Sequence, residues 1–139
     1  MDGFRFSTDV RARYSETDAQ GVVHHAVYLV WLEVARIAYL DQFPGGYKGL
    51  IEQGIEATTI EAHLRYRSGC RFDDRVRIWT RAGDVRGARF RFDYLLERLS
   101  EPAEPVAEGS TAHACVDARS LRPVRMRHWL VEAIVHVEA

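Results

Sequence analysis

The chain has 139 residues, of which 19 are lysine or arginine and 20 are aspartate or glutamate. This length is typical of one domain with a substantial core, so we expect a single domain over residues 1–139. The formal net charge of -1 argues against nucleic acid and anionic membranes as partners, because both favour strongly basic proteins.

Cysteine usage and the start of the chain indicate the compartment. Cys70 and Cys115 are far apart and form no CxxC motif, so we expect free thiols in a reducing environment. Charged residues at Asp2, Arg5 and Asp9 do not fit a signal peptide. Together these features favour a cytoplasmic location.

The predicted elements begin with a half-buried strand over residues 4–14, where apolar and polar side chains alternate. A polar turn over residues 15–23 follows, and an apolar segment then predicts a helix over residues 26–43. Pro44 and the two glycines after it are expected to end this helix. Residues 47–53 are expected to add one or two helical turns.

The long helix is apolar around nearly its whole circumference. Only four polar residues interrupt it: Glu33, Arg36, Asp41 and Gln42. Such a helix is expected to be buried, and its length of roughly 16 to 18 residues and its internal charges argue against stable membrane insertion. The three-residue spacing of Glu33 and Arg36 favours an ion pair within the helix.

Four further strands are predicted after Gly54, over residues 55–67, 75–85, 88–99 and 106–118. The two prolines within residues 101–105 place that segment in a loop. Small residues at 109–112 indicate a close approach to the helix, and residues 128–137 predict a terminal helix. The order indicates an α+β domain in which an antiparallel sheet of about five strands wraps around one long central helix.

Asp18 is the strongest candidate for chemistry, because it lies just before the start of the long helix. Unpaired N–H groups and a partial positive charge at a helix start can hold a carbonyl oxygen while negative charge develops on it. A carboxylate beside them can attack an acyl group or activate water. The alternative is that Asp18 turns the chain and caps the helix, with Gly21 supplying the bend.

His24 and His25 follow the turn, and either could position water or a leaving group, or offer its backbone N–H to an oxyanion. Ordinary first-turn residues are the alternative. No third ligand lies at metal-binding spacing, so we expect no metal site. Tyr28 and Trp31 are expected to pack in the core, although Tyr28 could place its hydroxyl near the site.

Residues 14–36, which read YSETDAQGVVHHAVYLVWLEVAR, resemble the signature of the 4-hydroxybenzoyl-CoA thioesterase family of hotdog-fold proteins. They are most similar to the branch that contains the Tol–Pal-associated short-chain acyl-CoA thioesterases. The similarity continues in residues 64–74 and 107–111. A hotdog fold agrees with the sheet and helix inferred above.

The resemblance implies roles for individual residues. Asp18 matches the family's catalytic aspartate, which acts as nucleophile or general base, and His25 matches the position whose backbone N–H polarises the carbonyl. Gly21 and Tyr28 match substrate-binding positions, and we place His24 with them. The chain departs from the family at Val27, where many relatives have asparagine.

The resemblance also implies an activity and a partner. It implies hydrolysis of a short-chain or aromatic acyl-CoA, with coenzyme A as part of the substrate and no other cofactor. It further implies a homodimer or a dimer of dimers with active sites between subunits. Two alternatives stay open: a thioesterase for acyl-carrier-protein thioesters, and a non-catalytic acyl-CoA binding module.

Overall fold

The computed structural model describes residues 3–139 and contains one sheet, three α-helices and a short 3-10 helix. The strands are β1 (Phe6–Arg11), β2 (Ile55–Tyr66), β3 (Arg75–Arg86), β4 (Arg89–Arg98) and β5 (Glu104–Asp117). The helices are η1 (Tyr14–Glu16), α1 (Val27–Leu40), α2 (Gly46–Glu52) and α3 (His128–Glu138). The α+β prediction of five strands and a long helix is confirmed.

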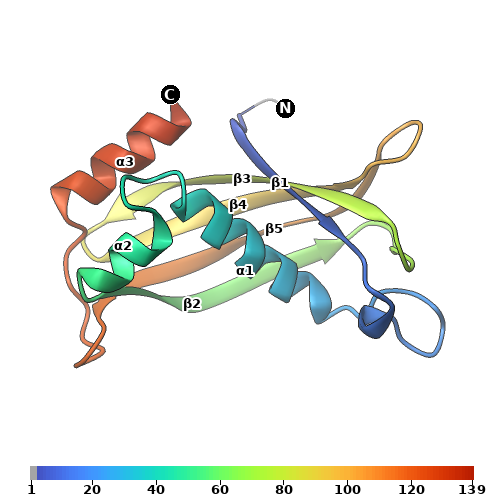
Figure 1. Ribbon diagram of the computed structural model, residues 1–139, viewed down its shortest axis with the longest axis horizontal. Helices are drawn as coiled ribbons and strands as arrows, with labels where there is room; N and C mark the ends of the chain where they lie inside the picture. The colour runs from blue at the N-terminus through green and yellow to red at the C-terminus, as the bar shows by residue number, and fades with distance from the viewer. Residues whose placement is uncertain (1–2) are drawn as a thin grey trace.

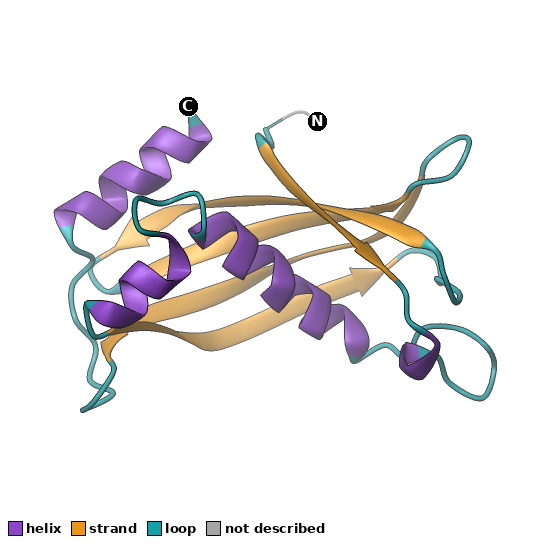
Figure 2. Ribbon diagram, in the orientation of Figure 1, coloured by secondary structure: helices purple, strands orange, loops and turns teal. Residues whose placement is uncertain are grey.

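The sheet has the strand order β1-β3-β4-β5-β2, and all neighbouring strands are antiparallel. Helix α1 crosses one face of this sheet, as Figure 1 shows. Helices α2 and α3 lie at one end of the sheet, and η1 with the following turn lies at the other end. Figure 2 shows the same two layers by secondary structure.

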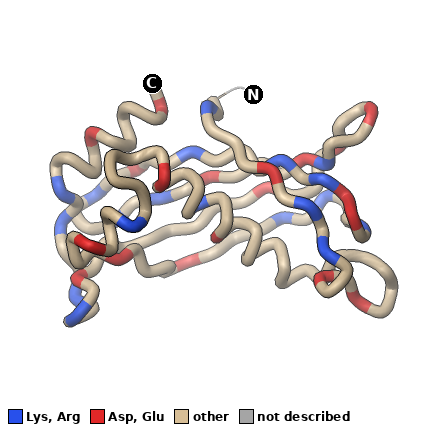
Figure 3. The backbone as a smooth tube through the Cα atoms, in the orientation of Figure 1, with Lys and Arg blue, Asp and Glu red and all other residues tan. Residues whose placement is uncertain are grey.

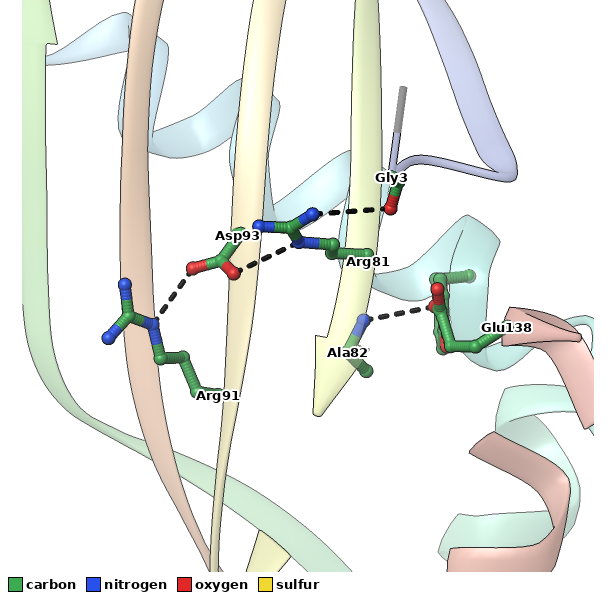
Figure 4. A network of polar contacts seen from close by, with 7 residues as sticks. Gly3, Arg81, Ala82, Arg91, Asp93 and Glu138 are labelled. Carbon is green, nitrogen blue, oxygen red and sulfur yellow. Dashed lines mark hydrogen bonds and ion pairs between the residues drawn. The ribbon is translucent and has the colours of Figure 1, made fainter. Parts of the chain in front are cut away.

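Alternating side chains of β3 and β4 build the core, as their sequence period predicts. The buried residues of these two strands are Val76, Ile78, Thr80, Ala82, Phe90, Phe92, Tyr94 and Leu96. On the opposite face, the Asp93 carboxylate accepts hydrogen bonds from Arg81 at 3.1 Å and Arg91 at 2.8 Å (Figure 4). These strand arginines therefore belong to a solvated face, and Figure 3 shows that basic and acidic residues are interspersed along the strands.

Helix α3 packs into the core through Leu130, Ala133 and Ile134, and one carboxylate adds polar contacts to the rest of the fold. Glu138 accepts a hydrogen bond from the Tyr39 hydroxyl of α1 at 2.6 Å. It also accepts one from the Ala82 N–H of β3 at 3.1 Å, as Figure 4 shows. At Ala82 the β3 edge extends beyond its pairing with β1, which ends at Phe6 and Thr80. Glu138 therefore satisfies a backbone donor that would otherwise lack a strand partner.

Helix α1 is buried on one face only, which corrects the expectation of burial on all sides. Its inner face contributes six buried residues to the core: Tyr28, Trp31, Leu32, Ala35, Tyr39 and Leu40. Its outer face exposes apolar residues, with Val30 53% and Val34 43% accessible. One five-stranded sheet covers only one side of a helix, so residues 3–139 leave the remaining apolar side chains of α1 uncovered.

Three local predictions were wrong. Pro105 lies inside β5, because β2 pairs with β5 only as far as Ala107 and leaves Pro105 facing β4 alone. Gly109 approaches β2 and not the helix, since a Cβ there would lie 2.1 Å from the His63 carbonyl oxygen. Arg36 bonds the Tyr94 hydroxyl at 3.2 Å, and no ion pair joins it to Glu33 among residues 3–139.

Candidate active site

Asp18 forms the tight turn that the sequence predicts. Its N–H donates to the Val22 carbonyl at 2.8 Å, and its own carbonyl accepts the Gly21 N–H at 2.9 Å. One carboxylate oxygen, Oδ1, accepts the Gln20 N–H at 2.8 Å, whereas Oδ2 accepts no hydrogen bond among residues 3–139. Gly21 has φ of +80°, a conformation that costs glycine little. The turn therefore uses one oxygen of Asp18 and leaves the other available for chemistry.

Glu16 joins this turn to the helix, and the sequence analysis missed it. It is 7% exposed, and its carboxylate accepts the Arg13 N–H at 2.7 Å and the Trp31 indole N–H at 3.1 Å. Its backbone carbonyl accepts the His24 N–H at 2.9 Å. The available signal was Trp31, because a tryptophan buried on an apolar helix requires an acceptor for its N–H.

The residues that lead into α1 use all but one of their backbone donors. The Ala26 N–H donates to His24 Nδ1 at 3.1 Å, and the Val27 N–H donates to the His24 carbonyl at 3.0 Å. The Tyr66 hydroxyl donates to the His25 carbonyl at 2.8 Å. Within residues 3–139 the His25 N–H has no acceptor, so it is the one free backbone donor among residues 24–27.

Asp18 does not cap α1, which resolves one of the two alternatives for this residue. The N-cap position is Ala26, which offers no side-chain hydrogen bond. The imidazole of His24 partly caps the helix instead, because its Nδ1 accepts the Ala26 N–H. The His24 ring also stacks on that of His25 at a centroid distance of 4.4 Å. Asp18 is thus a turn residue with a free carboxylate oxygen.

Tyr28 lies behind the turn in the core, with 2% of its surface exposed. Its ring packs edge-to-face against Trp31 at 5.0 Å and Tyr66 at 5.2 Å. Burial raises the pKa of its hydroxyl, and the neighbouring Cys70 adds to this effect, so Tyr28 stays neutral. The structure therefore brings Asp18, Gly21, His24 and His25 together and places Tyr28 beneath them.

Two cavities lie toward the far end of α1. An apolar cavity of about 40 Å³ lies under α2 and α3, where Phe43, Met126 and Leu130 line it. A larger groove of about 280 Å³ is lined by Glu33, Arg36 and Thr59. Neither cavity is lined by Asp18 or His25, so the candidate catalytic groups lie on an open surface of the single chain.

Three further features of the described residues concern metal ligands, cysteines and membrane-spanning helices. Residues 3–139 contain no group of three His, Cys, Asp or Glu side chains that could hold a metal ion. Cys70 and Cys115 are both buried free thiols, as expected. In the same residues, no helix has the length and apolar character needed to cross a bilayer.

Comparison with known proteins identifies the family of the chain. A model of the thioesterase-like superfamily matches residues 12–134. The acyl-CoA thioesterase YbgC of Haemophilus influenzae is 31% identical over 134 residues, which cover 96% of each chain. The putative acyl-CoA thioesterase YneP of Bacillus subtilis is 28% identical over 120 residues, covering 86% of this chain and 85% of the relative.

Solved structures give the same result. A hypothetical protein of Thermus thermophilus, TT1821, superimposes with a TM-score of 0.84 at 32% identity, covering 94% of this chain and 98% of that one. The DHNA-CoA thioesterase of Staphylococcus aureus also has a TM-score of 0.84, at 27% identity, covering 95% and 89%. The chain therefore belongs to the thioesterase-like superfamily and has the hotdog fold.

Proposed function

We propose that this protein hydrolyses the thioester bond of short-chain or aromatic acyl-CoA at the turn between η1 and α1. One observation carries the proposal: the free Oδ2 of Asp18 and the free N–H of His25 belong to one turn that is held to α1. The family relationship supports it, since the curated relatives above are named as acyl-CoA thioesterases.

The two groups supply complementary parts of a hydrolysis. The carbonyl oxygen of the thioester accepts the His25 N–H, and the partial positive charge at the start of α1 stabilises the negative charge that develops there. Oδ2 of Asp18 either takes a proton from the attacking water or attacks the carbonyl carbon itself.

Both routes end in the same products. In the first, the carbon–sulfur bond breaks, the hydroxyl from water completes the carboxylic acid, and the coenzyme A thiolate takes the proton that Asp18 had accepted. In the second, thiolate departure leaves a mixed anhydride on Asp18. Water then hydrolyses the anhydride to the acid and the free carboxylate, and the remaining proton of water goes to the thiolate. At the start of α1, Val27 has no polar side chain that could bind the substrate, so backbone groups bind the carbonyl oxygen of the thioester.

The same surface supports a homodimer with active sites at the interface. Strand β2 is one of the two edge strands of the sheet, and of its twelve residues only Ile55 is buried. A long free edge with unpaired backbone groups favours pairing with a second strand. The outer face of α1 adds exposed apolar residues, among them Leu29, Val30, Val34 and Ile37. A second copy across this surface would lie beside His25, because Tyr66 of β2 contacts it.

The direct test is thiol release from a panel of acetyl, butyryl, hexanoyl, lauroyl, benzoyl, 4-hydroxybenzoyl and phenylacetyl thioesters of coenzyme A. The variant Asp18→Asn retains an oxygen that can accept the Gln20 N–H, so the turn is expected to survive. We expect kcat to fall at least about a hundredfold, the scale of a lost base or nucleophile. His25→Ala keeps the backbone N–H and should retain measurable turnover.

A matched control is Asp84→Asn, an exposed aspartate with positive φ near the end of β3, and it should leave kcat unchanged. Near-native turnover by Asp18→Asn would refute the assigned role of the carboxylate. Loss of all activity in His25→Ala would indicate a role for the imidazole. If the wild type released no thiol from any thioester of the panel, this result would favour a carrier-protein substrate or a binding module.

A further inference from the structure

The start of α1 is fixed by groups from three separate parts of the chain. The carbonyl of Glu16 holds the His24 N–H, the ring of His24 holds the Ala26 N–H, and the Tyr66 hydroxyl holds the His25 carbonyl. Glu16 and His24 are close to His25 in sequence, whereas Tyr66 is the last residue of β2. Tyr66 therefore provides a long-range side-chain bond from β2 to this turn, in addition to the backbone bond from the Val23 N–H to the Cys70 carbonyl at 2.8 Å.

We propose that Tyr66 is a positioning residue for the reaction: its hydroxyl holds the His25 carbonyl so that the neighbouring His25 N–H points toward the substrate. This inference rests on the proposed function, because it assigns a role to the group that orients the oxyanion donor. A donor must be correctly placed before the reaction begins, and an error of about 1 Å can cost about a hundredfold in rate.

The environment of Tyr66 suits this role. Its ring packs edge-to-face against the buried Tyr28 at 5.2 Å with an interplanar angle of 78°, and this contact sets the direction of the hydroxyl. Partial burial raises the pKa of Tyr66, so the hydroxyl stays protonated and can only donate to a carbonyl oxygen. The side chain is nevertheless 45% exposed, so the hydroxyl can be removed without emptying the core.

Tyr66 also lies on the free edge of the sheet, beside the surface proposed for the second copy. Any shift of the end of β2 is transmitted through a 2.8 Å hydrogen bond to the turn that carries the His25 N–H. Pairing of β2 with another strand would restrict this motion. The arrangement thus connects the geometry of the donor to the edge of the sheet.

The test compares Tyr66→Phe with wild type on a thioester that wild type hydrolyses. Phenylalanine keeps the ring contact with Tyr28 and removes only the donor. We expect kcat to fall at least about fivefold, equivalent to one lost hydrogen bond of about 1 kcal/mol, while KM changes less than about twofold. Amide hydrogen exchange of Val27, whose N–H bonds the His24 carbonyl, should become faster.

Tyr14→Phe is the matched control. Tyr14 lies in η1 on the same turn, is 77% exposed, and its hydroxyl forms no hydrogen bond among residues 3–139. It should leave kcat, KM and amide exchange unchanged.

The outcomes separate this proposal from the proposed function. Unchanged kcat in Tyr66→Phe, with an active wild type and an impaired Asp18→Asn, overturns the role of Tyr66 alone. A lower kcat without faster exchange at Val27 also overturns it, because Tyr66 would then act on the substrate directly. A lower kcat in Tyr66→Phe beside a fully active Asp18→Asn supports Tyr66 and refutes the role of Asp18. A wild type that hydrolyses no thioester overturns both.

Discussion

His113 should make the stability of this protein depend on pH below neutrality. It is 1% exposed, stacks on Phe90 at a centroid distance of 5.3 Å, and forms a 2.7 Å hydrogen bond with Thr111. Burial, together with the positive charge of Arg36, lowers the pKa of His113 from its usual 6.5 to about 4. The imidazole is therefore neutral in the folded protein at neutral pH.

A chain of hydrogen bonds explains how the neutral ring is accommodated. Arg36 can only donate, so it donates to the Tyr94 oxygen at 3.2 Å, and the Tyr94 hydroxyl shares a hydrogen bond with the Thr111 hydroxyl at 2.6 Å. The Thr111 hydroxyl also forms a hydrogen bond with Nε2 of His113, and Nδ1 lies 3.4 Å from the Thr59 hydroxyl. A second proton on the ring would place a positive charge in this buried network, beside that of Arg36.

The sign and size of the effect follow from the two pKa values. Between pH 6.5 and 4 the unfolded chain binds a proton at His113 and the folded chain does not, so stability is lost as pH falls through this window. A difference of about 2.5 units corresponds to about 3 kcal/mol. Asp9 and Asp117, whose pKa values are lowered below the usual 3.8, contribute a further loss only at lower pH.

Urea denaturation at a series of pH values between 7 and 4 measures this loss directly. His113→Gln should be less stable than wild type at pH 7, because the hydrogen-bond chain is disturbed, but its stability should fall less steeply toward pH 4. The exposed His63 provides the control, and His63→Gln should keep the wild-type slope. Equal slopes for wild type and His113→Gln would refute the inference that His113 is neutral in the fold.

Two further substitutions test the packing of β2 and α1. Val34→Asp places a charge on the exposed apolar face of α1 and should shift the protein toward monomer in sedimentation experiments. Val135→Asp, on the exposed face of α3, is the control and should cause no such shift. A monomeric wild type would contradict the proposed interface. Gly109→Ala should lower the free energy of unfolding by about 2 kcal/mol or more, since its Cβ would collide with the His63 carbonyl. Gly83→Ala is the control, because a Cβ at Gly83 meets no atom within 4 Å. Equal stability of these two variants would contradict the close approach of Gly109 to β2.

Local pattern was sufficient to predict the elements and the turn that carries the candidate site. Period-two alternation in β3 and β4 identified their buried faces, because the side chains of a strand alternate between the two sides of a sheet. The polar turn before an apolar helix placed Asp18, Gly21 and His25 together, since they lie within eight consecutive residues. Nearness in sequence made this part of the site predictable.

The groups that support the site could not be found in this way. Glu16 and Trp31 are separated by one turn and part of a helix, and Tyr66 is forty-one residues from the carbonyl that it holds. The hydrophobic periodicity of the sequence does not indicate such contacts, because they depend on how α1 crosses the sheet and where β2 ends. The partner of Arg36 is a similar case: the spacing favoured Glu33, but burial of Tyr94 offered a hydroxyl that the guanidinium reaches across the core.

The sequence by itself determined that an apolar helix and an antiparallel sheet must cover one another, and that a carboxylate precedes the helix. Only the tertiary structure decided which face of α1 is covered, which oxygen of Asp18 remains free, and which backbone N–H is left without an acceptor. The physical reason is that amphipathic period and turn chemistry act over a few residues, whereas hydrogen-bond satisfaction is settled only when distant segments pack together.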